Sequence, residues 1–445
     1  MTNAESAVDG HRDEDVEAAA SSSGSAARRP LRRLAIASMV GTTLEYYDFA
    51  VYNTLAALLF NQLFFPSFDP LSGTILALST FAVGYLSRPF GGVIFGHLGD
   101  RRGRRFVLVS TLLVMGATTA LMGALPTYEA AGVASPIMLV ALRFIQGAAL
   151  GGEWAGAVLL SAEHGRPEQR GRNASWAQMG PSLGTLLATG AIAALTWLLS
   201  DDAFKAWGWR IPFFASLALI AFGWWIRAGV EETPLFRRLE RNQQKARAPV
   251  ADVFRGHWRG LLVAGGVRLG PDVLYSLTAV FSLSYLTAMM GQSRTVALIG
   301  LSIAGACNAL SIPFFGSLSD RLGRRAVYGV GAALGLVWLL VFFALLDSGS
   351  AFLIAGALAG ALVIHAMMYG PQAALIAEQF PTQVRYAGAS LAYTLAGVVG
   401  GGIAPAAFAA LFKIYRTTAV VAIYAATALL ITSAVLFAAR EYKER

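Results

Sequence analysis

Five side chains stand out among the ionisable groups inside the long apolar stretches of this sequence, where a charge is costly. They are Glu45, Asp48, Arg143, Arg268 and Asp272. Ionisable residues inside a membrane span are rare, and they commonly mark the path of an ion or of a polar solute. These positions are therefore the first candidates for chemistry.

Glu45 and Asp48 lie at i and i+3, so they share one face of a helix. Two neighbouring carboxylates in an apolar surrounding can load and release a proton near neutral pH. We expect this pair to couple protons, with Asp48 ahead of Glu45 because it lies deeper in its stretch. The alternative is a static ion pair that only holds helices together.

The arginines cannot give up their protons, so each must pair with a carboxylate or with an anionic solute. Arg143 is a candidate both for proton coupling and for substrate binding. Glu153, further along the same stretch, either joins the proton site or pairs with Arg88. Arg268 and Asp272 lie at i and i+4, so the arginine either binds a substrate anion or is neutralised by its neighbour. Asp272 in turn either adds a proton site or selects a cationic group of the substrate.

Uncharged polar residues also fall near the middle of apolar stretches. Tyr47, Gln178 and Gln372 are predicted to hydrogen-bond a polar solute, although most tyrosines in membrane proteins are anchors or packing residues. His365 either titrates or is a satisfied packing residue, and its isolation favours packing.

The elements that must position these residues are membrane helices. The chain has 445 residues, of which 56% are hydrophobic and only 14% charged, and its mean hydropathy is +0.56. About twelve apolar runs reach the ~20 residues that a crossing helix needs. They cover roughly 34–62, 71–97, 106–125, 136–163, 173–199, 211–230, 260–290, 296–318, 327–346, 352–378, 386–412 and 417–439.

The net charge of +9 does not indicate nucleic-acid binding, because the arginines lie in short loops beside apolar runs. That placement follows the positive-inside rule and predicts that both termini face the cytoplasm. The five histidines show no metal-ligand spacing, and the lone cysteine, Cys307, cannot form a disulfide within the chain. We expect no metal and no cofactor. No nucleophile triad or phosphate-binding loop supports an enzyme.

The predicted organisation is an all-α membrane protein of twelve transmembrane helices in two pseudo-symmetric six-helix bundles. Residues 1–33 are predicted to be a disordered cytoplasmic tail, 34–230 the N-terminal bundle and 231–259 a cytoplasmic linker. Residues 260–439 are predicted to be the C-terminal bundle and 440–445 a second tail. A duplicated half accounts for this symmetry.

Two repeats carry the evidence for duplication. Gly96–Arg105 and Gly316–Arg325 share Gly, Leu, Asp, Arg, Gly, Arg and Arg at matching positions. A Glu at the end of one run and an Arg at the start of the next also recur at equal spacing in both halves. We expect these residues to latch the two halves on the cytoplasmic side, or else only to set the topology. The set is Asp100, Arg101, Arg104, Glu163, Arg170, Asp320, Arg321, Arg324, Glu378 and Arg385.

The repeated loop resembles the signature loop of the major facilitator superfamily. The stretches Gly41–Tyr52, Ser87–Gly92, Arg143–Trp154 and Glu378–Arg385 are similar to its metabolite:proton symporter branch. The resemblance implies a two-bundle carrier with a central cavity and proton-coupled uptake of small polar metabolites. It also places Arg143 near the proton site on the first span, and so implies an Arg143–Asp48 pair that exchanges when a proton or substrate arrives.

Together these features predict a proton symporter that imports a small organic anion across the inner membrane by alternating access. We expect its partners to be a proton, a small polar metabolite and the lipid bilayer, and we expect a monomer. The alternatives are a proline/betaine-type osmolyte symporter, a metabolite exporter of the same fold, or a membrane receptor that moves no solute.

Overall fold

A computed structural model describes residues 39–102, 104–151, 169–228, 249–381 and 384–441. At residues 81, 93, 96–102, 104–108, 225–228, 249 and 386 it describes the backbone alone. The predictions for the N-terminal tail, for Glu153 and Glu163, and for most of the linker fall outside these ranges.

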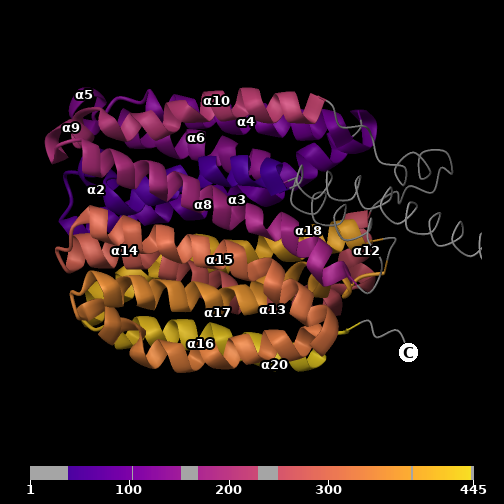
Figure 1. Cartoon of the computed structure of the whole chain (residues 1–445). Coiled ribbons are helices and arrows are strands. Elements are labelled where there is room, and N and C mark those ends of the chain that lie inside the picture. Colours follow the sequence, from indigo (N-terminus) through magenta and orange to yellow (C-terminus); the bar gives the residue numbers. More distant parts are fainter. Residues whose placement is uncertain (1–38, 103, 152–168, 229–248, 382–383, 442–445) are drawn as a thin grey trace, which may run out of the picture.

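The first half of the chain forms a layered set of helices (Figure 1). Residues 39–58 are helical. The elements that follow are α2 (Phe60–Leu63), α3 (Pro70–Arg102), α4 (Arg104–Gly123), α5 (Tyr128–Ala131), α6 (Ala134–Leu150), α8 (Arg170–Leu198), α9 (Asp201–Ala206), the short 3₁₀ turn η2 (Gly208–Arg210) and α10 (Ile211–Ala228).

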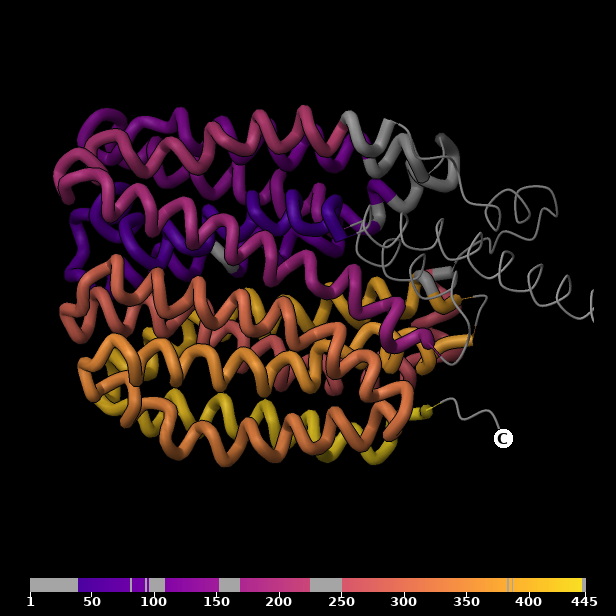
Figure 2. The backbone as a smooth tube through the Cα atoms, in the orientation of Figure 1, coloured from indigo at the N-terminus to yellow at the C-terminus, as the bar shows by residue number. Residues whose placement is uncertain are grey.

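The second half repeats this pattern. Its elements are α12 (Pro249–Gly256), α13 (Trp258–Tyr275), η3 (Ser276–Phe281), α14 (Ser282–Ser284), η4 (Tyr285–Met289), α15 (Arg294–Leu322), α16 (Arg324–Asp347), α17 (Ala351–Ala377), α18 (Arg385–Gly397), η5 (Val398–Ile403), α19 (Ala404–Tyr415) and α20 (Ala419–Ala438). Figure 2 shows the two halves side by side, indigo to magenta against orange to yellow.

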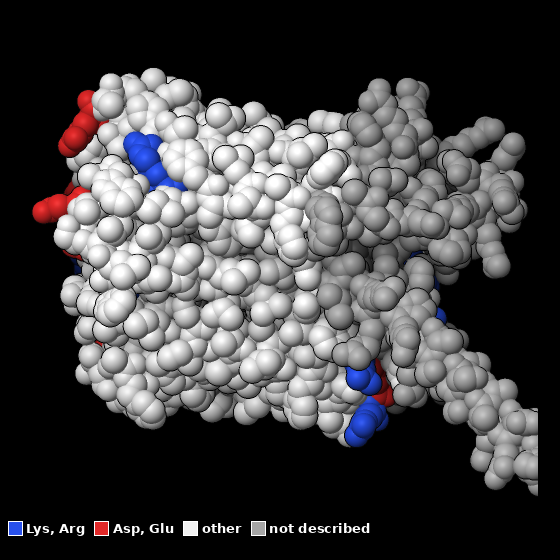
Figure 3. Space-filling model, turned by 45° about the horizontal axis from the view of Figure 1, so that its top comes forward, with Lys and Arg blue, Asp and Glu red and all other residues white. Residues whose placement is uncertain are grey.

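The described helices match the predicted spans. Eight helical segments are long and apolar enough to cross a membrane, and three shorter apolar helices accompany them. With the helix at 39–58 they account for the predicted set. Figure 3 shows a broad uncharged band between charged groups at the two ends, as a membrane-embedded surface requires.

Two spans are not regular α-helices. The seventh contains the π-helical segments η3 and η4, and the eleventh contains η5. The two spans meet there, because the Ser276 hydroxyl donates to the carbonyl oxygen of Gly400 at 2.8 Å. A π-helical turn widens the helix and commonly marks a functional region. The apolar pattern alone could not predict it.

Close backbone contact fixes α6 against α3. A Cβ at Gly147 would lie 2.0 Å from the carbonyl oxygen of Gly84, and one at Gly151 would lie 1.9 Å from that of Arg88. Small residues four apart let two helix backbones touch in this way. The crossing places the arginines of α3 and α6 near each other inside the first half.

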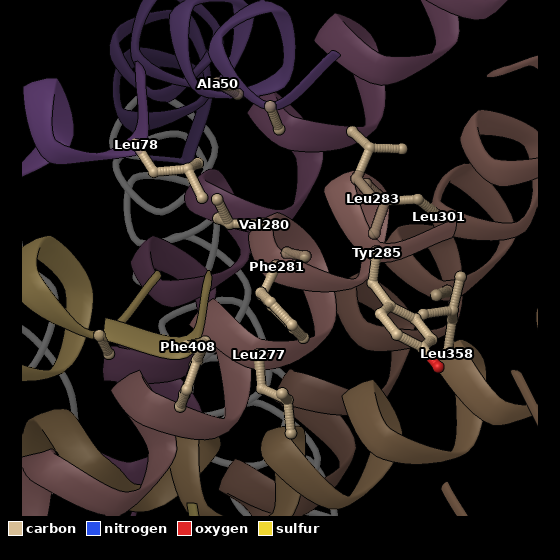
Figure 4. Packing of buried hydrophobic residues seen from close by; sticks show 14 of the residues in the cluster. Ala50, Leu78, Leu277, Val280, Phe281, Leu283, Tyr285, Leu301, Leu358 and Phe408 are labelled. Atoms are coloured by element: carbon tan, nitrogen blue, oxygen red, sulfur yellow. The ribbon is translucent and has the colours of Figure 1, made fainter. Parts of the chain in front are cut away.

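An apolar core joins the two halves at the end of the bundle where α8 ends and α3 begins. Ala50 and Leu78 of the first half belong to the same buried cluster as Val280 and Leu283 of the second half. Figure 4 shows these residues around the π-helical segments of the seventh span. The polar centre described next lies further along the bundle, toward the end where α15 ends.

Candidate functional site

The Asp48 side chain is buried inside the first half. Only 3% of it is exposed, and its Oδ1 atom accepts no hydrogen bond within the described part of the chain. The hydroxyl groups of Thr119 and Ser216 lie against the carboxyl group. Glu45 is equally buried, one turn earlier on the same helix. A buried carboxylate oxygen without a hydrogen-bond donor is an unfavourable site for a negative charge, so this carboxyl group is suited to bind a proton.

Arg143 and Asp48 belong to one polar chain but do not touch. Arg143 donates to Gln146 at 2.5 Å and to Asn53 at 2.8 Å, and Gln146 donates to Thr119 at 2.7 Å. Among the described side chains, Gln146 and Thr119 therefore stand between the arginine and the carboxyl group. The direct pair that the family resemblance implies is not formed in this structure.

Arg88 is a second buried arginine of the first half, predicted from the sequence only as an alternative partner for Glu153. It is 2% exposed, and its guanidinium carbon lies 3.8 Å from the Tyr85 ring centroid and 4.7 Å from that of Phe49. Its Nε and Nη2 atoms make no hydrogen bond to any described residue. Its position inside an apolar stretch is the same signal that singled out Arg143.

Arg268 is a buried arginine of the second half, on α13. Its Nε lies 2.6 Å from a carboxylate oxygen of Asp272, and both side chains are buried. The guanidinium carbon lies 3.1 Å from the centroid of the Tyr393 ring, and Nη1 makes no hydrogen bond within the described part. The pair is therefore formed, yet it leaves one donor of the guanidinium unsatisfied.

A tyrosine pair joins the halves beside Arg268. The hydroxyl oxygens of Tyr46, in the first half, and Tyr393, in the second, lie 2.8 Å apart. The neighbouring Tyr47 instead donates to the carbonyl oxygen of Pro212 at 3.0 Å, which places it against α10. Tyr46, and not the predicted Tyr47, thus reaches the centre between the halves.

The two predicted glutamines both lie near this centre. Gln178 of α8 donates across the halves to the carbonyl oxygen of Tyr369 at 3.4 Å. Gln372 of α17 donates to the Tyr328 hydroxyl at 3.3 Å, and its own Oε1 accepts no bond from described groups. Both therefore remain candidates for contact with a solute.

At the end of the bundle where α15 ends, Asp320 bridges the two halves. Its two carboxylate oxygens accept the backbone N–H groups of Gly171 and Arg172, each at 2.9 Å. These are first-turn N–H groups of α8, which lack partners within the helix. Arg324 lies 3.5 Å from Asp320 and also pairs with Glu378. The second copy of the repeat thus contacts the other half, and its role as a cytoplasmic latch stays a prediction.

The remaining latch candidates differ in what the structure describes. Arg385 donates to the carbonyl oxygen of Phe380 at 3.3 Å. Arg321 is exposed and Arg170 half-buried, Asp100, Arg101 and Arg104 are described by their backbone alone, and Glu163 is outside the described ranges.

The opposite end carries two further ion pairs between the halves. Lys413 lies 3.3 Å from Asp69, and Arg294 lies 3.3 Å from Asp201. Hydrogen bonds from Ser72, together with Lys413, lower the pKa of Asp69 to about 2. Within the described residues, no cluster of His, Cys, Asp or Glu could hold a metal ion.

Two pseudo-symmetric membrane bundles with charged side chains buried between them define a transport protein and not an enzyme. The chain belongs to the major facilitator superfamily, in its sugar and metabolite transporter family. Residues 34–262 match the family model "Sugar (and other) transporter", and residues 272–445 match "Major Facilitator Superfamily".

Relatives and a solved structure are similar over most of the chain. The shikimate transporter of Escherichia coli (strain K12) is 40% identical over 86% of this chain and 88% of its own. The proline/betaine transporter of the same strain is 32% identical over 83% of this chain and 76% of its own. A partially occluded inward open xylose transporter XylE from E. coli matches with a TM-score of 0.73 at 20% identity, covering 93% of this chain and 99% of that one. The predicted fold is confirmed.

Proposed function

We propose that this protein is a proton-coupled symporter that imports a small organic anion by alternating access. The observation that carries the proposal is Arg268, a permanently charged side chain buried between the halves with one donor unused. A buried guanidinium needs anionic partners, and Asp272 supplies only one. A substrate carboxylate would supply the second.

Arg88 supports the same substrate class from the first half. It is close enough to interact electrostatically with Tyr46 and Asp272. Two guanidinium groups from opposing halves would bind a carboxylate and draw the halves together. The tyrosine pair Tyr46–Tyr393 spans the same gap, so substrate entry and closure would involve the same atoms.

Asp48 is the proposed proton carrier. Its protonation would remove a negative charge at one end of the chain that leads through Thr119 and Gln146 to Arg143. The change would reach Arg143 through this chain of hydrogen bonds, because the two side chains do not touch. Coupling follows if the halves rock only when Asp48 is protonated and the substrate is bound, or when both are absent.

Contacts between the halves at the two ends of the bundle would break and form as the halves rock. The Asp320 contact holds one end, and the Lys413 and Arg294 pairs hold the other. We propose that the Asp320 end faces the cytoplasm, as do both termini, and that the protein is a monomer of the inner membrane. The relative "Inner membrane metabolite transport protein YhjE" of E. coli supports that location, being 36% identical over 84% of this chain.

Proteoliposomes test the proposal. Wild-type protein should accumulate a carboxylate such as shikimate when an inward proton gradient is imposed, and a protonophore should abolish accumulation. Asp48→Asn, which mimics the protonated state, should lose gradient-driven accumulation but keep exchange of labelled for unlabelled substrate. Accumulation by Asp48→Asn that still depends on the gradient would contradict the assignment of the proton site.

The osmolyte alternative is less compatible with the site. Betaine carries a quaternary ammonium group, which binds over aromatic faces. Arg268 already occupies one face of Tyr393, at 3.1 Å. An exporter would be recognised by substrate movement in the opposite direction in inside-out vesicles.

A further inference from the structure

His365 lies in the middle of α17, among polar groups that the proton and carboxylate sites do not use. It is 3% exposed, and its ring stacks on Tyr369 with centroids 4.9 Å apart. The Tyr275 ring lies 5.3 Å away, and Arg268 is close enough to interact electrostatically. The residue therefore borders the Arg268 site.

The hydrogen bonds of Asn308 determine where His365 carries its proton. Nδ2 of Asn308 donates to the carbonyl oxygen of Leu362, which can only accept, so the orientation of the amide is fixed. Its Oδ1 accepts from Ser182 of α8, in the other half. The same Nδ2 lies 3.1 Å from Nδ1 of His365, and Nδ1 must therefore accept.

The ring is thus neutral with its proton on Nε2. Arg268, the charged group that acts on this ring, is already paired with Asp272. Among the described residues, nothing accepts the Nε2–H group. The result is a donor of fixed orientation beside the proposed carboxylate site.

Tyr275, whose ring packs against His365, belongs to a hydroxyl pair. The hydroxyl oxygens of Tyr275, from the second half, and Thr185, from the first, are 2.7 Å apart. Ser182 and Thr185 lie three residues apart on α8, so one face of this helix presents both hydroxyls to the second half. Uncharged hydrogen-bonding groups of the first half thus reach His365 through one intermediate each, Ser182 through Asn308 and Thr185 through Tyr275.

We propose that His365, with Tyr275 and Thr185, forms an uncharged subsite that binds a hydroxyl or carbonyl oxygen of the transported carboxylate. His365 donates through Nε2, while Arg268 binds the carboxylate. The substrate class is then a small oxygenated carboxylate, and neither a plain alkyl carboxylate nor a betaine. This inference rests on the proposed function, because it assumes that Arg268 binds the carboxylate.

The test compares oxygenated carboxylates with partners that lack the hydroxyl groups. Purified full-length protein is titrated with shikimate against cyclohex-1-ene-1-carboxylate, and with malate against succinate, with thermal stabilisation as the readout. The variants are His365→Leu, which removes the donor, and His365→Gln, which keeps an N–H group. Loss of one hydrogen bond to the substrate weakens binding by about tenfold.

The expected result is that the wild type prefers the oxygenated member of at least one pair by about tenfold or more. His365→Leu should reduce this preference to within about twofold by weakening only the oxygenated member, and His365→Gln should keep part of it. An unchanged preference in His365→Leu, or equal weakening of both members, overturns the inference.

Two further outcomes separate this inference from the proposed function. Carboxylates that bind the wild type with no preference for oxygenation would contradict the subsite alone. Binding of none of the four would contradict the carboxylate site itself, and the subsite with it. In ¹⁵N-histidine-labelled wild-type protein, His365 should give the spectrum of a neutral ring protonated on Nε2. A ring protonated on Nδ1 overturns the inference whether or not the variants fold.

Discussion

Replacing Asp320 by alanine should release the contact between the halves at the end where α15 terminates. The change removes two hydrogen bonds of 2.9 Å from a carboxylate to the first N–H groups of α8. It also removes a 3.5 Å ion pair with Arg324, in which both side chains are largely buried. A charged cap at a helix N-terminus contributes about 1–2 kcal/mol to the contact between the halves, whereas the pair with Arg324 lies within the second half and does not favour either state.

A loss of about 1–2 kcal/mol corresponds to a shift of roughly 5- to 30-fold toward the state that is open at this end. Spin labels at Gln169 and Leu322, exposed positions on opposite halves, would report the distance between them. In electron–electron double resonance, Asp320→Ala should populate longer distances than the parent does. Cys307 would first be replaced by alanine to leave only the two labels.

Asp320→Asn is the matched control for this experiment. The amide keeps one acceptor oxygen but loses the charge. The shift toward the open state in Asp320→Asn should therefore be smaller than in Asp320→Ala, with roughly half of the free-energy change. If the ratio of long-distance to short-distance populations in Asp320→Ala changes by less than about twofold, the contact does not set this equilibrium. An identical shift in the two variants would show that the acceptor oxygen kept by asparagine does not contribute to the contact between the halves.

Three further predictions concern other parts of the bundle. Arg268→Gln should raise the KM for carboxylate uptake by at least about tenfold, and Arg268→Lys should recover little because an ammonium cannot match the fork geometry of the guanidinium. Lys413→Ala should lower the melting temperature slightly. Because the pKa of Asp69 is lowered to about 2, that difference should be constant above about pH 4 and shrink as the pH falls toward 2; a difference that persists when Asp69 is protonated would contradict the ion pair. Gly147→Ala should destabilise by about 1–3 kcal/mol or prevent folding, since its Cβ would lie 2.0 Å from a backbone oxygen. Gly190→Ala, whose Cβ would meet no described atom within 4 Å, should be neutral in the same thermal melt.

The sequence could not predict the direction in which a side chain points around its helix axis. Tyr46 and Tyr47 are adjacent, yet one meets Tyr393 across the halves and the other donates to Pro212 within its own half. Successive residues on a helix differ by about 100° around the axis. A span that is apolar on all sides gives no pattern to show which direction faces the partner half.

The side chains that connect Asp48 to Arg143 could not be predicted from the sequence either. The sequence identified Asp48 and Arg143 as buried charges, but the structure places Gln146 and Thr119 between them. Arg88 carried the same signal as Arg143, and its location between Tyr85 and Phe49 became clear only from the crossing of α3 and α6. Such contacts depend on where separate helices meet, and a single sequence does not record that.

The sequence by itself determined the membrane location, the twelve spans, the duplicated halves and which residues carry buried charge. These properties are local, because they depend on the length and polarity of each stretch and on loop charges next to it. The tertiary structure decided which charges pair and which keep a free donor, the capping of α8 by Asp320, and the tautomer of His365. Those depend on angstrom-scale distances between helices far apart in the chain, which are set only when the helices pack together.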